Sequence, residues 1–281
     1  MGQEKPGLLD KAGAIRDLSA HITDIDSTVL NAKSLTHLST LPLSSLPVVS
    51  GNPRLGVPVK GIGKFIAIGL NFMDHAKEAG LPIPTEPPLF SKAISCLSGP
   101  NDAVMLPKDA EKADWEVELG IVIGRTTRYV SEERALESVA GYVLANDISE
   151  RNFQLERGTQ WDKGKGCDTF GPVGPWLVTP DEIGEPQDLN MFLDVNGERM
   201  QSGNTKTMIF TVRHLLSYVS RFMTLYAGDL LITGTPPGVG AGKKPPKFLR
   251  PGDTMHLGID KLGEQRQTVI EWRDLGDQVL P

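Results

Sequence analysis

From residue 61 onward, short apolar segments alternate with glycine and proline turns, and this pattern restricts the fold more than any other feature. It predicts strands at residues 64–69, 115–123, 139–145, 189–195, 230–233, 253–258 and 268–272. Helical spacing interrupts the strands at residues 131–138 and 212–224, and the longer segment has an apolar stripe of Leu215, Leu216, Val219 and Phe222. Many short strands with few helices predict a β-rich α+β fold, built as a roll or sandwich.

The N-terminal part has a different pattern and predicts a separate small unit. A hairpin signal lies within residues 7–18, and residues 23–37 have loosely helical spacing. Prolines punctuate residues 41–53, so a long helix cannot run through this connector. We therefore expect a small unit with its connector at residues 1–60 and a main domain at residues 61–281.

Composition excludes several classes of protein. With 39% hydrophobic and 23% charged residues among 281, the chain has the balance of a globular protein. A net charge of -6 argues against binding to nucleic acid, which needs a basic surface. No stretch approaches the roughly 18 apolar residues of a membrane span, and residues 1–10 lack the apolar core of a signal peptide. We expect a cytoplasmic protein without a membrane partner.

Residues 114–124 place two glutamates on one predicted strand. Apolar residues alternate with Glu116 and Glu118, which predicts a half-buried strand. Side chains two residues apart on a strand share one face and lie roughly 7 Å apart. Such like charges repel unless a cation or a proton relieves them. A bound divalent metal is one interpretation; two surface glutamates on a solvated face are the other.

His75 and Glu78 form a second candidate pair. They lie three residues apart on a short predicted helix that ends at Gly80, so both side chains share one helical face. A carboxylate beside an imidazole raises its basicity and fixes its tautomer, as removal of a proton from water requires. A solvated surface pair is the alternative interpretation.

Other polar residues lie where predicted strands end, and each also has a plain structural interpretation. Asp147 follows an apolar strand and could cap the next turn, while Thr235 lies in a turn after another strand. Glycines on both sides of Lys165 would let the backbone approach a ligand. Lys92 follows a double proline and could be a surface lysine. The two cysteines, Cys96 and Cys167, have no metal-ligand spacing.

Taken together, these segments resemble the fumarylacetoacetate hydrolase family over residues 62–273. The match rests, in chain order, on residues 69–75, 87–92, 116–119, 146–147, 164–165 and 233–236. Residues 160–175 are most similar to enzymes that act on 2,4-diketo-3-deoxy sugar acids, such as the rhamnonate and fuconate derivatives.

The resemblance implies a mixed β-roll core, a homodimer, and Mg²⁺ or Mn²⁺ as cofactor. It implies that the metal ligands are Glu116, Glu118 and Asp147. It also implies a water-activating pair, His75 and Glu78, on a lid, and it makes the main domain the catalytic one. The substrate contacts that it implies are Lys92, Arg151, Gln154, Lys165 and Thr235.

The chemistry of these residues agrees with that set. Carboxylate ligands without His or Cys favour Mg²⁺ or Mn²⁺ over Zn²⁺, and the lysines and Arg151 favour an anionic 2-oxo acid as substrate. Water deprotonated by His75 would attack C4 of a 2,4-diketo acid. Cleavage of the C3–C4 bond would then release a pyruvate enolate, stabilised by the metal and Lys165. With the resemblance, this chemistry predicts a hydrolase of carbon–carbon bonds that acts in sugar acid catabolism.

Other functions remain open at this point. The same metal site without a hydrolytic water would decarboxylate oxaloacetate or act as a related lyase or isomerase. A non-enzymatic binding module would bind a 2-oxo acid without turnover. Production of pyruvate with a second organic acid, rather than with CO₂, separates hydrolysis from decarboxylation.

Overall fold

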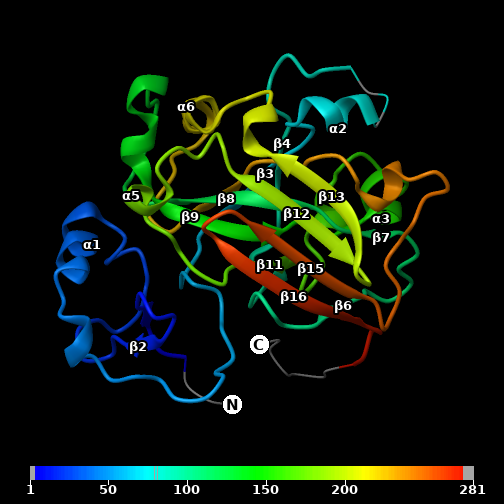
Figure 1. Cartoon of the computed structure of the whole chain (residues 1–281). Coiled ribbons are helices and arrows are strands. Elements are labelled where there is room, and N and C mark those ends of the chain that lie inside the picture. The colour runs from blue at the N-terminus through cyan, green and yellow to red at the C-terminus, as the bar shows by residue number, and fades with distance from the viewer. Residues whose placement is uncertain (1–3, 79, 81, 275–281) are drawn as a thin grey trace.

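The computed structural model describes residues 4–78, 80 and 82–274 (Figure 1). Its first five-stranded sheet has the order β4-β3-β14-β8-β9, with β14 parallel to β3 and the other neighbours antiparallel. The strands are β3 (Phe65–Ile68), β4 (Leu89–Ser91), β8 (Val117–Ile123), β9 (Val139–Asn146) and β14 (Leu230–Ile232). Each of the four predicted strands in this sheet is present.

The second five-stranded sheet has the order β13-β12-β15-β16-β6 and is antiparallel except where β16 meets β6. Its strands are β6 (Val104–Met105), β12 (Asn190–Val195), β13 (Glu198–Asn204), β15 (Thr254–Ile259) and β16 (Gly263–Ile270). The sequence pattern did not predict β13, because this strand is almost entirely polar. Mixed sheets with few helices confirm the predicted β-rich α+β class.

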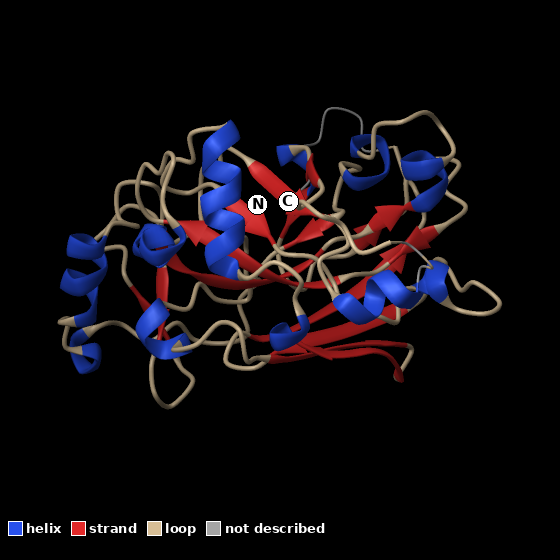
Figure 2. Cartoon of the chain, turned by 90° about the horizontal axis from the view of Figure 1, so that it is seen from above, coloured by secondary structure: helices blue, strands red, loops and turns tan. Residues whose placement is uncertain are grey.

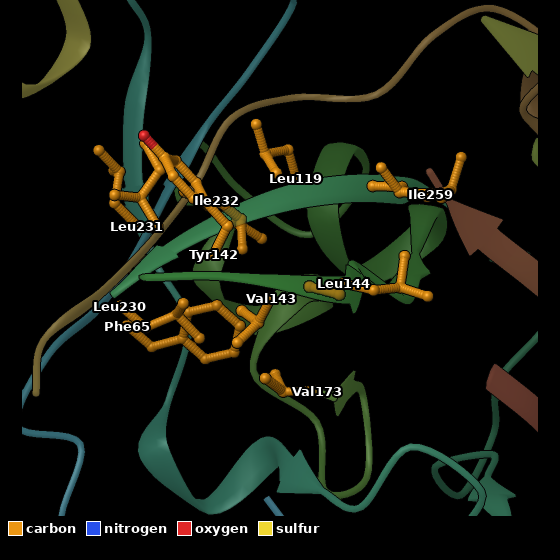
Figure 3. Packing of buried hydrophobic residues seen from close by; sticks show 14 of the residues in the cluster. Phe65, Leu119, Tyr142, Val143, Leu144, Val173, Leu230, Leu231, Ile232 and Ile259 are labelled. Carbon is orange, nitrogen blue, oxygen red and sulfur yellow. The ribbon is translucent and has the colours of Figure 1, made fainter. Parts of the chain in front are cut away.

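The core lies where the two sheets pack together. Strand β8 contacts β12 and β15 of the second sheet, and β9 contacts β16. Figure 3 shows side chains from both sheets around β8 and β9, among them Leu119, Leu144 and Ile259. Every residue of β8 is buried. The predicted half-buried strand is therefore wrong: β8 lies inside its sheet with the second sheet packed against it.

Short strand pairs and helices complete the fold, and they place residues that the site uses. β7 (Ala113–Asp114) pairs with β10 (Ser149–Glu150), and β5 (Leu97–Ser98) pairs with β11 (Gly171–Pro172). After β10 come α3 (Arg151–Leu155) and α4 (Asp162–Lys165). Six further helices are also short: α2 (Met73–Glu78), α5 (Pro180–Ile183) and the 3₁₀ helices η1 (Leu43–Ser45), η2 (Ile94–Cys96), η4 (Thr205–Thr207) and η5 (Gly240–Gly242). Figure 2 shows the strands in central layers, with the helices mostly at the periphery.

Three helices were predicted in the main domain: the short helix of His75 is present as α2, and the other two are present with altered ends. The first is a 3₁₀ helix, η3 (Glu132–Ser138), and the second is α6 (Val212–Phe222), whose N-cap is Thr211. Leu215, Leu216 and Val219 are buried, as predicted. Phe222 is 61% exposed, so its assignment to the buried stripe is wrong; the helix ends there and its last turn extends beyond the core. None of the helices in the described part of the chain has the length and hydropathy that crossing a membrane requires.

The N-terminal segment lies at one side of the fold (Figure 1). The predicted hairpin is formed by β1 (Gly7–Leu9) and β2 (Ile15–Asp17). Helix α1 covers only Ala32–Ser39, so helical spacing from residue 23 was misleading there; the Asp26 carboxylate bonds the Thr28 amide and hydroxyl and favours a turn. Leu30, in the N-terminal segment, packs in the main core. The division of the chain into two units at residue 60 remains a prediction. Residues 1–3 and 275–281 of the predicted units lie outside the described residues.

Candidate active site

Two strands of the first sheet bring three carboxylates together. Glu116 immediately precedes β8, Glu118 lies within β8, and Asp147 follows the last residue of β9. The antiparallel register pairs Val117 with Asn146, and the Asp147 amide donates to the Glu116 carbonyl over 2.9 Å. One oxygen from each carboxylate lies within 4.8 Å of the others. The residues proposed as metal ligands are therefore one cluster in space.

These carboxylates are buried. The exposed fractions of Glu116, Glu118 and Asp147 are 6%, 1% and 0%, so the alternative of a solvated strand face is wrong. Glu118 Oε2 accepts a hydrogen bond from the Gly234 amide over 2.7 Å. Gly234 has a φ of +91°, and a Cβ there would lie 2.8 Å from the Asn71 Cβ. The turn that presents this amide therefore requires glycine.

Ion pairs connect the cluster to buried cations in an alternating series, which we call the ion-pair chain. Along it, each residue contacts the next in the order Asp114, Arg151, Glu116, Lys165, Asp147 and Lys92. The paired nitrogen and oxygen atoms are 2.6–2.8 Å apart. Because each charge has an opposite neighbour, the chain is tolerated in an interior where an isolated charge is costly.

Lys165 lies between two of the predicted metal ligands. Its Nζ is 2.7 Å from Glu116 Oε2 and 2.6 Å from Asp147 Oδ2. Helix α4 carries this lysine, and Gly164 lets α4 approach β10, because a Cβ on Gly164 would lie 2.4 Å from the Glu150 carbonyl oxygen. The glycine beside Lys165 thus permits close packing against the protein itself.

Lys92 is enclosed by protein. Its side chain is 0% exposed, its Nζ lies 2.7 Å from Asp147 Oδ1, and it donates to the carbonyls of Ile148 and Lys165. Burial acts to lower the pKa of Lys92, but the charge and hydrogen bond of Asp147, together with other nearby groups such as Glu116, outweigh it and raise the pKa above its ordinary value. The surface-lysine interpretation is therefore wrong.

Arg151 and Gln154 lie together on α3. Arg151 Nη1 donates to Gln154 Oε1 over 3.0 Å, and Nη2 donates to Glu116 Oε1 over 2.6 Å. Arg151 is 9% exposed and Gln154 is 4% exposed. Burial acts to lower the pKa of Arg151, but the charges of Asp114 and Glu116 outweigh it and raise the value, so the site retains a fixed positive charge.

Thr235 has an additional partner that sequence reasoning missed. Its hydroxyl donates to the Val117 carbonyl over 2.9 Å and accepts from Gln201 Nε2 over 2.8 Å. Gln201 also accepts from the Val117 amide over 3.0 Å. This glutamine lies on the polar strand β13, where no local pattern separates a buried residue from an exposed one. Asn71 lies in the motif at residues 69–75 but was given no role, because its partner is distant in the sequence: its side chain donates to the Thr233 carbonyl over 2.8 Å.

The two strand glutamates have opposite pKa shifts. Burial acts to raise the pKa of Glu116, but Lys165 and Arg151 outweigh it and lower the value to about 2. For Glu118, burial and the charges of Asp147 and Glu116 all raise the pKa well above its ordinary value. Without a metal, the surroundings of Glu116 therefore favour its ionised form, whereas those of Glu118 disfavour it.

His75 and Glu78 lie on α2, close to the cluster. His75 Nδ1 is 3.3 Å from Glu78 Oε2, and both Glu78 oxygens accept from the Gly238 amide over 3.0–3.1 Å. His75 is 9% exposed, so a fully solvated pair is the wrong interpretation. Burial acts to raise the pKa of Glu78, but His75 and the Gly238 amide outweigh it and lower the value. A charge on His75 also lowers the pKa of Glu116, which links α2 to the cluster electrostatically.

The cluster fits a hard divalent cation. Its donors are carboxylate oxygens, the ligands that Mg²⁺ and Mn²⁺ prefer. Asp147 Oδ1 is buried without an aligned hydrogen bond, although Lys92 Nζ is nearby. Lys165 brings a positive charge between Glu116 and Asp147. The chemistry of the donors, and the positive charge already accepted between Glu116 and Asp147, both suit a metal ion.

A family model described as "Fumarylacetoacetate (FAA) hydrolase C-terminal" matches residues 64–270. The chain belongs to the fumarylacetoacetate hydrolase family. The matched region includes both five-stranded sheets and all of the ion-pair chain. The resemblance inferred from the sequence motifs is confirmed.

Relatives within this family carry two kinds of description. The 2,4-didehydro-3-deoxy-L-rhamnonate hydrolase of Sphingomonas sp. (strain SKA58) is 64% identical over 280 residues, covering 99% of this chain and 96% of that protein. The structure of fumarylacetoacetate hydrolase from Exiguobacterium antarcticum matches with a TM-score of 0.84 and 36% identity, covering 95% of each chain. A probable 2-hydroxyhepta-2,4-diene-1,7-dioate isomerase from Mycobacterium abscessus matches with a TM-score of 0.79 and 33% identity, covering 96% of each chain.

Proposed function

We propose that this enzyme is a metal-dependent hydrolase that cleaves the C3–C4 bond of a 2,4-diketo acid to pyruvate and a second acid. The substrate class that we favour is the 2,4-diketo-3-deoxy sugar acids, because the Sphingomonas relative is described as acting on one of them. The observation that carries the proposal is the cluster of three buried carboxylates, joined to Lys165 and within electrostatic reach of His75.

In this mechanism, Glu116, Glu118 and Asp147 hold Mg²⁺ or Mn²⁺. When bound, the ion supplies Lewis-acid polarisation of the 2-oxo acid and neutralises charge that develops on its oxygen. Arg151 and Lys165 bind the substrate carboxylate and stabilise the same negative charge from the protein side. Gln154 and Thr235 complete the substrate contacts, while the enclosed Lys92 acts by holding Asp147 in place.

His75 takes a proton from water, and Glu78 orients the imidazole. The hydroxide adds to the C4 carbonyl. The C3–C4 bond then breaks, its electron pair passes to the pyruvate enolate, and C4 becomes the carboxyl carbon of the second acid. The imidazolium of His75 returns a proton to C3, so the base is regenerated and pyruvate is released.

Isotope-labelled water tests this reaction directly. With Mg²⁺ and a 2,4-diketo-3-deoxy sugar acid in H₂¹⁸O, we expect equimolar pyruvate and a second acid that carries one ¹⁸O in its new carboxylate, as read by mass spectrometry. Chelation of the metal should stop turnover, and Mg²⁺ or Mn²⁺ should restore it. An unlabelled second acid would contradict hydrolysis at C4.

A second candidate is a metal-dependent decarboxylase or other lyase, or an isomerase. The similarity to the Mycobacterium abscessus protein favours keeping it, because that protein is described as an isomerase. Oxaloacetate consumed with release of CO₂ and pyruvate, and no second organic acid, would support it. Membership of an enzyme family argues against a binding module without turnover.

The resemblance also leads us to propose a homodimer in the cytoplasm that binds neither nucleic acid nor membranes. Light scattering should give twice the mass of the 281-residue chain. The negative net charge supports the absence of a nucleic-acid partner.

A further inference from the structure

Asp114, at the outer end of the ion-pair chain, gathers several hydrogen-bond donors on one buried carboxylate. Its Oδ1 accepts from the amides of Trp115 over 2.9 Å and Gly240 over 2.6 Å. Its Oδ2 accepts from the Ala241 amide over 3.0 Å and from Arg151 Nε over 2.8 Å. Asp114 is 0% exposed. One side chain thus bonds both to Arg151 and to the turn at η5.

The contact with Arg151 fixes the orientation of its guanidinium group. That group is planar, so a carboxylate that binds Nε also sets the directions of both Nη atoms. In this orientation Nη1 reaches Gln154 and Nη2 reaches Glu116. Asp114, which lies outside the carboxylate cluster, therefore holds the Nε edge of Arg151, while the Nη atoms point toward Gln154 and Glu116.

The contact with η5 fixes the surface on which α2 docks. The Gly238 amide, two residues before η5, donates to the Glu78 carboxylate. A Cβ on Gly242 would lie 2.8 Å from the carboxyl carbon of Glu78. The segment at residues 238–242 therefore lies between Asp114 on one side and the helix of His75 on the other.

We propose that Asp114 is a positioning residue with two roles that share one carboxylate. It orients Arg151 toward the carboxylate of a 2-oxo acid, and it fixes the turn that receives Glu78. The first role rests on the proposed function for the identity of the ligand. The second role depends on the fold alone.

Asp114→Asn tests both roles, because it keeps the shape of the side chain and removes its charge. Asp229→Asn is the matched control. Asp229 is 2% exposed, and its carboxylate accepts from the amides of Lys64 and Tyr226 and pairs with Lys64 Nζ. Both variants lose a buried carboxylate that accepts backbone amides. Of these two aspartates, only Asp114 contacts Arg151.

Oxalate, which presents the carboxylate of a 2-oxo acid, serves as the probe in titration calorimetry with Mg²⁺-loaded protein. Asp114→Asn is expected to weaken oxalate binding by about 10- to 100-fold, whereas Asp229→Asn should change it less than about twofold. Hydrogen exchange of residues 238–242 should accelerate only in Asp114→Asn. With a substrate that turns over, KM should rise more than kcat falls, because substrate binding is what weakens.

Equal oxalate affinity in the two variants, or unchanged exchange at residues 238–242, would overturn the proposal. If Asp114→Asn does not fold, Asp114→Glu replaces it: the charge stays, the carboxylate shifts by one methylene, and the same weaker binding and faster exchange are expected. A wild-type protein that cleaves no diketo acid would refute the proposed function, yet the oxalate and exchange comparison would still decide the roles of Asp114.

Discussion

Along the ion-pair chain, neighbouring charges meet at 2.6–2.8 Å between buried strands and helices, whereas His75 and Glu78 meet at 3.3 Å on the six-residue helix α2. The chain ends on backbone groups at both sides, through Asp114 and Lys92. Within the part of the chain that the structure describes, the carboxylate of the α2 pair bonds to one backbone amide, that of Gly238.

This difference assigns different tasks to the two regions. Groups that stabilise developing charge work best when they are preorganised, because they then need no reorganisation during the reaction. A base that must admit substrate and water can stand on an element held by fewer contacts. The comparison predicts that substitutions in the ion-pair chain act on binding and stability, while substitutions in α2 act on the water step.

Glu118→Gln should have the largest effect, a complete loss of metal-dependent turnover. The amide keeps an oxygen for the Gly234 bond but cannot supply the charge that a divalent ion needs. Burial and the charges of Asp147 and Glu116 disfavour a charge on Glu118 and raise its pKa, so a neutral amide suits this position in the metal-free protein. Thermal melting should therefore show a nearly unchanged melting temperature without metal and no increase on adding Mg²⁺.

If Mg²⁺ still increased the melting temperature of Glu118→Gln, Glu118 would not be a metal ligand. Glu198→Gln, on the exposed part of β13, provides the control, because Glu198 pairs only with Lys247 among the described residues. Its response to Mg²⁺ should match that of the wild type.

His75→Ala should come next, lowering cleavage of a 2,4-diketo acid by about 10²- to 10⁴-fold, as expected for loss of a general base. Decarboxylation of oxaloacetate needs an electron sink but no hydroxide, so any such side activity should fall much less. Steady-state rates with both substrates give the two factors. Equal losses would mean that His75 serves substrate binding or closure, and the division of tasks between the two regions would fail.

The smallest effects concern stability, and a pair of variants compares the regions directly. Lys92→Met leaves Asp147 with one fewer buried partner and should lower the free energy of unfolding by about 3–5 kcal/mol. Glu78→Gln alters a contact whose carboxylate is partly solvated, and it should cost less than about 1 kcal/mol. Urea denaturation of the metal-free proteins measures both. Similar losses would show that α2 is held as firmly as the ion-pair chain.

Much of the fold followed from the sequence because apolar alternation reports burial. The strands around β8 and β9 and the shared face of Glu116 and Glu118 are properties of local spacing. The predictions of helices were wrong where a side-chain hydrogen bond or the end of a helix outweighed the apolar pattern. Asp26 favours a turn within a helical pattern, and Phe222 lies where α6 leaves the core.

The site was less accessible from the sequence. That Asp147 lies beside Glu116 depends on the register of β8 with β9, which spacing alone does not give. The motifs of the family supplied that grouping. Gln201 and Asp114 carry no local signal at all, because their roles arise from residues distant in the sequence, such as Thr235 and Ala241.

The alternation of the ion-pair chain also bears on the order in which the site fills. Its acidic and basic members are equal in number, so it has no net formal charge, and Glu118 adds one negative charge when it is ionised to bind the metal. A divalent ion alone would leave an excess positive charge in a buried place, and the carboxylate of a 2-oxo acid would cancel it. Metal and anion should therefore bind with positive cooperativity. By thermodynamic reciprocity, oxalate should strengthen Mg²⁺ binding by the same factor as Mg²⁺ strengthens that of oxalate.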